Sequence, residues 1–343
     1  MKFGLFDHVD RSDRPLAQQF DERLEFVVAA DAAGFYCYHV AEHHGTPLNM
    51  VPVPGVFLGA LARLTKRIRL GPLVYLLPLY SPLRLIEEIG MLDQLSYGRL
   101  DVGVGRGISP FELNFHNVDA ASSRDIFMDA YDTLVEGLTC PRLTHKGPYF
   151  SYTNVPMEIP PLQKPHPPFW YGSSNATGST WAGEHGMHFL TNGPTPRAKQ
   201  NIDTFTEALA TRGAAAIPKP EFGRGTAIGV NRQVVVADTD AQARRIAEPA
   251  HHSHYMSLTK LWRENTGHHE TGIALEGLDE SITAGTVICG SPDTVSRAIQ
   301  EQTSDLGVNY MNMAMFFGTM PLADALHSIE LFSAEVMPKF DRV

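Results

Sequence analysis

Short runs of apolar and β-branched residues alternate along the chain with longer segments whose apolar positions recur every three or four residues. The short runs predict strands covered on both faces, and the longer segments predict amphipathic helices. Such alternation is typical of βα units around a parallel sheet. The predicted strands lie at residues 2–6, 35–40, 68–77, 100–105, 169–172, 187–191, 233–237 and 308–316. Eight units predict an α/β fold, a single (β/α)8 TIM barrel, which 343 residues can build with insertions.

Three segments break the pattern and are predicted to be insertions. Residues near 141–168 are dense in proline and have little period, and those near 214–225 and 265–285 are rich in glycine or histidine. Long connections of this kind are surface excursions in a compact barrel. We therefore expect one domain over residues 1–343.

Composition limits the partners and the compartment. The chain is 43% apolar and 19% charged, like an ordinary soluble protein, and its net charge of −10 is spread without acidic runs. Nucleic acids and anionic membranes need clustered lysine and arginine, so neither is an expected partner and a small molecule is. The three cysteines form no CxxC pair, and no leader or membrane-length apolar run is present, which predicts a cytoplasmic location.

Polar residues at strand ends are the first catalytic candidates, because barrel enzymes carry their chemistry on the loops after the strands. Glu42, His43 and His44 end the second strand. Adjacent side chains in an extended chain point to opposite faces, so the two histidines are poor joint ligands and no metal site is predicted. An imidazole, with a reference pKa of about 6.5, can donate a hydrogen bond to an oxygen intermediate or move a proton, or it can satisfy a buried loop.

Two loops are candidates for binding an anion. The glycine-rich run 103–107 carries Arg106, whose planar cation suits phosphate. The loop 172–179 leads into a predicted helix, whose free N–H groups and dipole favour an anion. Arg124, in the first turn of another predicted helix, can add charge. Each of these features also has an ordinary structural explanation: a tight turn, a capping loop and a solvated arginine.

These elements, in this order, resemble the bacterial luciferase-like family over nearly the whole chain. The most specific matches are Glu42-His43-His44 and the stretch 92–107, and residues 290–295 also fit. The resemblance implies a flavin at the C-terminal ends of the barrel strands. It assigns His43 to the reaction of reduced flavin with oxygen, aided by Glu42 or His44.

The resemblance also assigns a cofactor site. Leu73 and Val74, which composition alone places in the core, match the pair beneath the flavin ring that a cis peptide bond often joins. Arg106 and Arg124 match residues that hold the flavin phosphate. The matching phosphate loop comprises Ser174, Asn175, Ala176, Thr177 and Gly178.

Three positions depart from the family pattern. Gly105 stands where luciferases carry a cysteine, which predicts more room near the ring. Asn175 replaces a familiar serine and can still hydrogen-bond a phosphate. Gly178 replaces a familiar threonine and can contribute only its backbone.

The resemblance implies a flavin-dependent monooxygenase. Such an enzyme takes reduced FMN from a separate flavin reductase and uses O2, through a flavin hydroperoxide, to oxygenate a small, apolar organic substrate. A deazaflavin-dependent dehydrogenase and a non-catalytic flavin-binding partner subunit are the alternatives, and a homodimer is expected by resemblance. An aromatic substrate pocket, or alternatively ordinary core, is suggested by Tyr75, Phe111, Phe115, Trp170 and Trp262.

Overall fold

The computed structural model describes residues 1–267 and 275–340. Its strands are β1 (Lys2–Asp7), β2 (Cys37–Val40), β3 (Arg69–Pro72), β4 (Tyr75–Leu76), β5 (Val102–Gly105), β6 (Arg142–Lys146), β7 (Ser151–Pro156), β8 (Phe169–Gly172), β9 (His188–Thr191), β10 (Ile228–Val236), β11 (Val287–Gly290) and β12 (Tyr310–Ala314). Its α-helices are α1 (Leu16–Ala33), α2 (Pro54–Leu64), α3 (Pro82–Leu95), α4 (Pro110–Phe115), α5 (Ser123–Thr139), α6 (Ala176–Glu184), α7 (Thr195–Arg212), α8 (Asp240–Thr266), α9 (Leu278–Thr283), α10 (Pro292–Leu306) and α11 (Leu322–Leu331). Short 3-10 or π turns cover Leu77–Leu79, Phe332–Val336 and Met337–Phe340.

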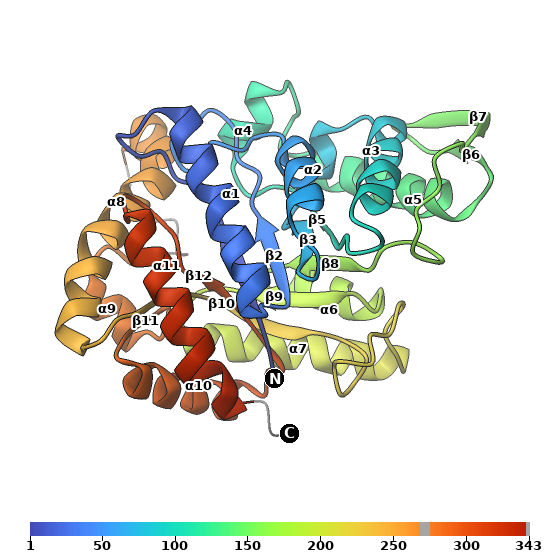
Figure 1. Ribbon diagram of the computed structural model, residues 1–343. Coiled ribbons are helices and arrows are strands. Elements are labelled where there is room, and N and C mark those ends of the chain that lie inside the picture. Colours follow the sequence, from blue (N-terminus) through green and yellow to red (C-terminus); the bar gives the residue numbers. More distant parts are fainter. Residues whose placement is uncertain (268–274, 341–343) are drawn as a thin grey trace.

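Parallel strands form a nearly closed barrel with helices around it (Figure 1), as the alternating pattern predicted. Neighbouring strands follow the order β3-β2-β1-β12-β10-β9-β8-β5-β4. β3 and β4 are successive pieces of one strand position, so the ends of this path meet. A parallel bridge between Leu70 and Leu100 completes the contact between β3 and the segment that precedes β5. All carboxyl ends of the barrel strands therefore lie at one end of the molecule.

The third predicted strand, 68–77, is divided in the structure. β3 and β4 are separated by Leu73 and Val74, which are joined by a cis peptide bond. β3 pairs with β2, whereas β4 pairs with β5 through Tyr75 opposite Val104. The chain thus changes its hydrogen-bonding neighbour at these two residues and presents both of them at the rim of the barrel.

The seventh strand was placed too late in the sequence. The predicted run 233–237 covers only the second half of β10, and that half pairs with β11 outside the ring. The first half pairs with β9 and β12. Gly229 lowers the strand signal there, yet the packing requires it, because a Cβ at this position would lie 2.5 Å from Leu190. β11 was not predicted.

The irregular segments contain some regular structure. β6 and β7 form an antiparallel hairpin within 141–168. α9 lies within 265–285, but residues 268–274 of that predicted insertion lie outside the described residues. The assignment of the whole chain to one domain stays a prediction.

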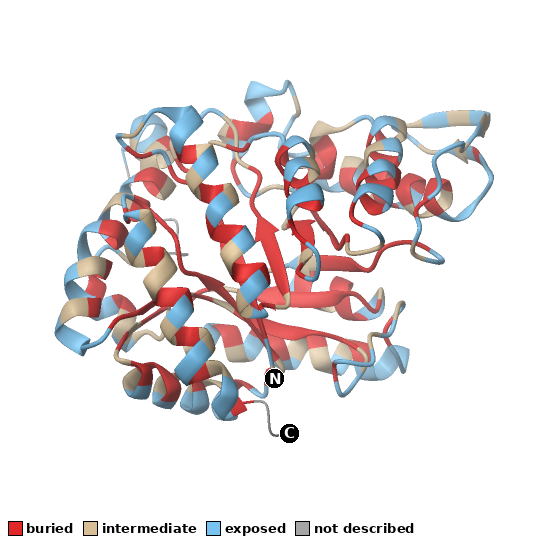
Figure 2. Ribbon diagram, viewed as in Figure 1, coloured by how far each residue is buried: buried red, intermediate tan, exposed pale blue. Residues whose placement is uncertain are grey.

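The pattern of burial agrees with the continuous apolar runs of the predicted strands and with the three-to-four-residue period of the predicted helices (Figure 2). The barrel strands are buried along their length, while the surrounding helices have one buried and one exposed face. Trp170 and Tyr310 are fully buried inside the barrel, with ring centroids 5.1 Å apart. They fill the barrel and close it below its carboxyl end.

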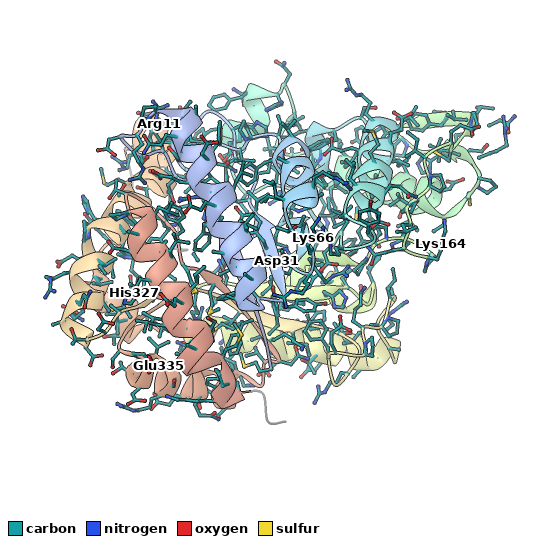
Figure 3. The ribbon with its side chains drawn as sticks, viewed as in Figure 1. Arg11, Asp31, Lys66, Lys164, His327 and Glu335 are labelled. Atoms are coloured by element: carbon teal, nitrogen blue, oxygen red, sulfur yellow. The ribbon has the colours of Figure 1, made fainter. Side chains whose placement is uncertain are left out.

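A buried carboxylate connects the first helix to the third strand position. Asp31, near the end of α1, accepts hydrogen bonds from the backbone N–H groups of Lys66, Arg67 and Ile68 (Figure 3). Burial alone would raise the pKa of Asp31, but these hydrogen bonds lower it. The loop that leads into β3, and so toward Leu73, is fixed by this contact.

Candidate active site

A cavity of about 320 Å³ lies at the carboxyl ends of the barrel strands, where the sequence placed the site. Residues after β1, β2, β3, β5, β8 and β9 contribute to its wall, and helix α8 covers another side. Of the predicted site residues, seven line it: Glu42, His43, Leu73, Val74, Arg106, Ser174 and Asn175. The others, His44, Arg124, Ala176, Thr177 and Gly178, lie outside this lining.

His43 is oriented by a carboxylate that the sequence analysis did not identify. Its Nδ1 lies 3.1 Å from Oε1 of Glu112, and Oε2 of Glu112 accepts the backbone N–H of His44 at 2.8 Å. Burial alone would raise the pKa of Glu112, but the hydrogen bond and charge of His43 lower it. An ionised Glu112 fixes the Nδ1 side of the ring and leaves Nε2 for the cavity.

A recognisable local pattern positions Glu112. Ser109 caps helix α4, and its Oγ accepts the backbone N–H of Glu112 at 3.3 Å, with Pro110 in the first turn. The sequence Ser109-Pro110-Phe111-Glu112 has the spacing of a capping box. This signal, after the fourth strand, could have found the residue.

Glu42 and His44 form a separate pair. Oε1 of Glu42 lies 2.9 Å from Nε2 of His44, while Oε2 accepts the N–H of Leu76 and the hydroxyl of Tyr80. Glu42 is buried and both of its oxygens are occupied. The carboxylate next to His43 in sequence therefore holds β4 and His44, and the carboxylate in contact with His43 is that of Glu112.

The wall made by Leu73 and Val74 also corrects the expectation about Gly105. A Cβ at Gly105 would lie 2.3 Å from Cγ2 of Val74, so Val74 already occupies the space of the missing side chain. The predicted extra room near the ring is absent at this point. Glycine at 105 instead permits the close approach of β5 to Val74.

Helix α6 supplies a group of backbone donors at another side of the cavity. Asn175 caps the helix, and its Oδ1 accepts the N–H of Gly178 at 3.0 Å. The Gly178 N–H is thereby occupied, contrary to the expectation that it serves a phosphate. The first-turn N–H groups of Ala176 and Thr177 have no hydrogen-bond partner within residues 1–267 and 275–340.

Arginines surround this helix terminus. Arg106 lines the cavity, and its Nη1 donates to Oγ of Ser123, 3.4 Å away, beside Arg124. Burial raises the pKa of Tyr171, and the charges of Arg124 and Arg106 both act against that rise, so both guanidinium groups lie near this ring. Arg197, which the sequence analysis missed, donates from Nε to the backbone oxygen of Ser174 at 3.1 Å.

A second set of imidazoles was also missed. His8 follows β1, and His251 and His254 lie on helix α8, and all three line the cavity. His254 Nδ1 is 3.0 Å from both carboxylate oxygens of the buried Asp10. His8 ends a strand, as His43 does, so the same reasoning could have found it. Nothing in the helical period marks His254.

The aromatic residues expected around the substrate lie elsewhere. Trp170 fills the barrel, Tyr75 donates its hydroxyl to Glu88, and Phe111 packs edge-on against Trp262. Phe115 is half exposed beside Gly45. None of the five residues proposed for an aromatic pocket lines the cavity, whose α8 side instead carries histidines with Tyr255 and Leu258.

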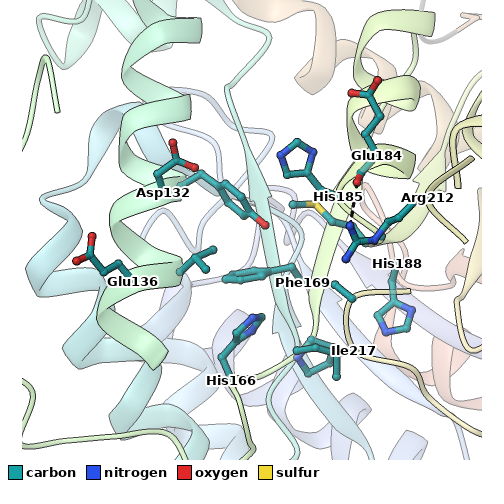
Figure 4. A pocket seen from close by; sticks show the side chains of 15 residues that line it. Asp132, Glu136, His166, Phe169, Glu184, His185, His188, Arg212 and Ile217 are labelled. Atoms are coloured by element: carbon teal, nitrogen blue, oxygen red, sulfur yellow. Dashed lines mark hydrogen bonds between the residues drawn. The ribbon is translucent and has the colours of Figure 1, made fainter. Parts of the chain in front are cut away.

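A larger cavity, of about 510 Å³, lies at the opposite end of the barrel, between α5 and α6 (Figure 4). His166 precedes β8 there, and Gly186 and Met187 precede β9. Arg212 closes one side by donating to the backbone oxygen of Glu184. Amino ends of barrel strands serve stability rather than catalysis, so the candidate active site is the smaller cavity.

The described residues contain neither a cluster of metal-ligating side chains nor an apolar helix long enough to cross a membrane. Among residues 1–267 and 275–340, no three His, Cys, Asp or Glu side chains are grouped so as to hold a metal ion. Over the same part of the chain, no helix combines the length and the apolar character that a membrane crossing requires.

Comparison with known proteins decides the family. Residues 1–310 match the family described as luciferase-like monooxygenase. The chain belongs to this family. Protein y4wF of Sinorhizobium fredii, described as uncharacterized, is 32% identical over 99% of this chain and 97% of its own length. The oxygenase component of a flavin-dependent trigonelline monooxygenase from Acinetobacter baylyi is 27% identical over 83% of this chain and 78% of its own length.

Solved structures share the barrel. The oxygenating constituent of 3,6-diketocamphane monooxygenase from Pseudomonas putida, in complex with FMN, has a TM-score of 0.80 and 24% identity, and the match covers 99% of this chain and 98% of that chain. The coenzyme F420-dependent tetrahydromethanopterin reductase of Methanopyrus kandleri has a TM-score of 0.73 and 19% identity, with 99% of each chain covered. Solved structures with this fold thus include one in complex with FMN and one described as dependent on coenzyme F420.

Proposed function

We propose that the protein is the oxygenase of a two-component system, which takes reduced FMN from a separate flavin reductase and inserts one atom of O2 into a small organic molecule. The observation that carries this proposal is His43, which is held by Glu112 at Nδ1 and lines a cavity walled by Leu73 and Val74. The trigonelline relative, described as an oxygenase component, supports the expectation of a reductase partner.

The cavity and the adjoining N-terminus of α6 together fit FMN at both ends of that molecule. The apolar side chains of Leu73 and Val74 offer a face for an aromatic ring system. The free N–H groups of Ala176 and Thr177, together with Arg106, offer donors and positive charge for a phosphate. When bound, reduced FMN supplies two electrons, so that one oxygen atom enters the substrate and the other leaves as water.

The chain's own groups position and protect this chemistry. Nε2 of His43 would be available to donate a hydrogen bond or to hold a proton in the cavity, because Glu112 fixes Nδ1. Glu42 stabilises the adjoining strand through Leu76 and Tyr80, so its role is to hold the wall. Helix α8 supplies His251, His254, Tyr255 and Leu258 to one side of the cavity.

Hydride transfer with coenzyme F420 is the second candidate, and the barrel shared with the F420-dependent reductase favours it. Anaerobic titration of the purified protein with reduced FMN and with reduced F420, followed by admission of air, separates the two. We expect FMN to bind at least about tenfold more tightly, a difference of ~1.4 kcal/mol. Tighter binding of F420, with no oxygen consumed, would refute the oxygenase proposal.

A homodimer is part of the proposal. The neighbouring helices α2 and α3 carry exposed apolar side chains at Val56, Leu64 and Met91, and Tyr97 follows α3. Val56 is 76% exposed and Tyr97 is 71% exposed. A cluster of this kind favours a surface that a second copy covers, as the family resemblance suggested.

A further inference from the structure

Three imidazole rings lie in a row on one side of the cavity. The ring centroids of His8 and His43 are 5.6 Å apart and nearly parallel, and those of His8 and His254 are 5.0 Å apart. They come from the ends of β1 and β2 and from helix α8. The proposed oxygenase reaction uses His43 but gives no role to the other two.

His254 is held as a hydrogen-bond donor. Its Nδ1 contacts Asp10, which is fully buried and also accepts the backbone N–H of Gly318. Burial of His254 would lower its pKa, but the charge and hydrogen bond of Asp10, with the charge of Asp7, raise it. The ring therefore keeps its second proton to higher pH. Its Nε2 has no hydrogen-bond partner within residues 1–267 and 275–340.

His8 is held as a neutral ring. Burial and the neighbouring charges of His254 and His43 lower its pKa well below the ordinary value, and the charge of Asp10 opposes this only in part. Its edge packs on Phe6. Neither ring nitrogen has a hydrogen-bond partner among the described residues. A neutral imidazole has one donor and one acceptor nitrogen, so His8 adds a second donor beside His254.

We propose that His8 and His254 form a substrate subsite that binds a carbonyl-type oxygen, either of a ketone or of a carboxylate. A protonated imidazole can donate but cannot accept, so the ligand must bring an acceptor, and an oxygen with two lone pairs can meet both rings. A cation would be repelled by His254. Leu258 and Tyr255, on the same side of the cavity, can contact the rest of an organic molecule.

This inference names the substrate class of the proposed oxygenase and rests on that function for its biological meaning, but binding can be measured without turnover. The purified full-length protein, without flavin, is titrated with three probes that share one aromatic ring: acetophenone, benzoate and ethylbenzene. We expect at least one oxygen-bearing probe to bind about tenfold more tightly than ethylbenzene, because the unpaired donors gain a partner. If acetophenone binds more tightly than benzoate, the ligand of the subsite is a ketone, and if benzoate binds more tightly, it is a carboxylate.

Two variants locate the effect. His8→Phe keeps a stacked ring and removes both nitrogens, and His254→Gln keeps a donor for Asp10 while removing the imidazole. Each is expected to reduce the tenfold preference to about twofold or less. His252→Gln, an exposed residue on the same helix, is the control and keeps the preference. Thermal unfolding by circular dichroism checks that every variant is folded.

Equal affinity of the wild type for all three probes, or a preference that survives in both variants, overturns the subsite. Anaerobic binding of reduced FMN is measured in parallel with the same proteins. Loss of probe preference with FMN binding intact supports the subsite, whereas failure of the wild type to bind FMN overturns the oxygenase proposal and leaves the probe result as a separate outcome.

Discussion

Oε1 of Glu112 lies 3.1 Å from Nδ1 of His43, although 69 positions separate the two residues in the chain. The capped first turn of α4 brings the buried carboxylate of Glu112 to His43, whose side chain stays partly exposed to the cavity. A carboxylate behind an imidazole fixes both its tautomer and its orientation. The reactivity that we assign to His43 therefore depends on both the loop after β2 and the first turn of α4.

Replacement of Arg106 by alanine tests the phosphate end of the cavity. We expect FMN to bind about tenfold more weakly, because an exposed charge-assisted hydrogen bond to phosphate is lost. Riboflavin, which lacks the phosphate, serves as the matched ligand and should lose less than about twofold. Fluorescence quenching gives both dissociation constants. An equal loss for the two ligands would remove Arg106 from the phosphate site.

Gly105→Ala tests the contact between β5 and the Leu73–Val74 wall. The new Cβ would lie 2.3 Å from Cγ2 of Val74, so we expect a loss of about 1–3 kcal/mol in the free energy of unfolding. Val74→Ala removes the obstructing atom. In the Val74→Ala protein, Gly105→Ala should therefore cost much less free energy of unfolding than it costs in the wild type. Urea titration of the four proteins gives the coupling. Independent, additive effects would show that Val74 does not fill this space.

Acid destabilisation should depend on two histidines below the cavity. Burial lowers the pKa of His39 and of His188 to about 4 each. The unfolded chain takes up protons as the pH falls below about 6.5, whereas the folded protein does not until about pH 4, so stability is lost across this window. Each histidine contributes a slope of up to about 1.4 kcal/mol per pH unit.

The double variant His39→Gln, His188→Gln should flatten that slope between pH 6.5 and 4.5, whatever its stability at pH 7. Glutamine at 188 can still accept the N–H of Ala227, as Nδ1 of His188 does. His252→Gln, at an exposed position, should leave the slope unchanged. An unaltered slope in the double variant would show that these rings do not stay neutral in the folded protein.

The proposed homodimer is tested at Val56. Val56→Asp places a charge at the most exposed large apolar side chain of α2. Sedimentation velocity should show a dimer for the wild type and a monomer for the variant, because a buried unpaired carboxylate is costly. Asp203→Asn, on the exposed side of α7, is the control. A wild-type monomer at micromolar concentration would contradict the proposal.

The sequence predicted the barrel because strand and helix periods differ and repeat along the chain. Because those periods also show where each strand ends, they located His43 after the second strand, and the same argument applies to His8 after the first. Glu112 and His254 lie on helices whose approach to the cavity depends on how loops return across the barrel. The capping box that begins at Ser109 marks Glu112, but no local pattern marks His254. The sequence left Trp170 open between a ligand pocket and the core, because an aromatic side chain suits both, and the structure places it in the core.

The effect of Gly105 illustrates a second limit of sequence reasoning. A missing side chain suggests an empty space, but a neighbouring side chain can fill that space. At Gly105 the side chain of Val74 fills it. Asn175 is similar: its amide can bind a phosphate, yet in the structure its Oδ1 caps α6. The residue type shows which interactions a side chain can make, and the fold determines which partners lie within its reach.

The most direct measurement follows the oxidation of reduced FMN on the protein. The anaerobic complex is mixed with O2, and the return of oxidised-flavin absorbance is recorded for the wild type, His43→Ala, Glu112→Gln and the exposed control Glu207→Gln. We predict that the absorbance of the wild type and of the control returns in two phases. In His43→Ala and Glu112→Gln the lifetime of the slow phase should fall about tenfold or more, while the dissociation constant of FMN stays unchanged. A single phase, identical in all four proteins, would contradict the account.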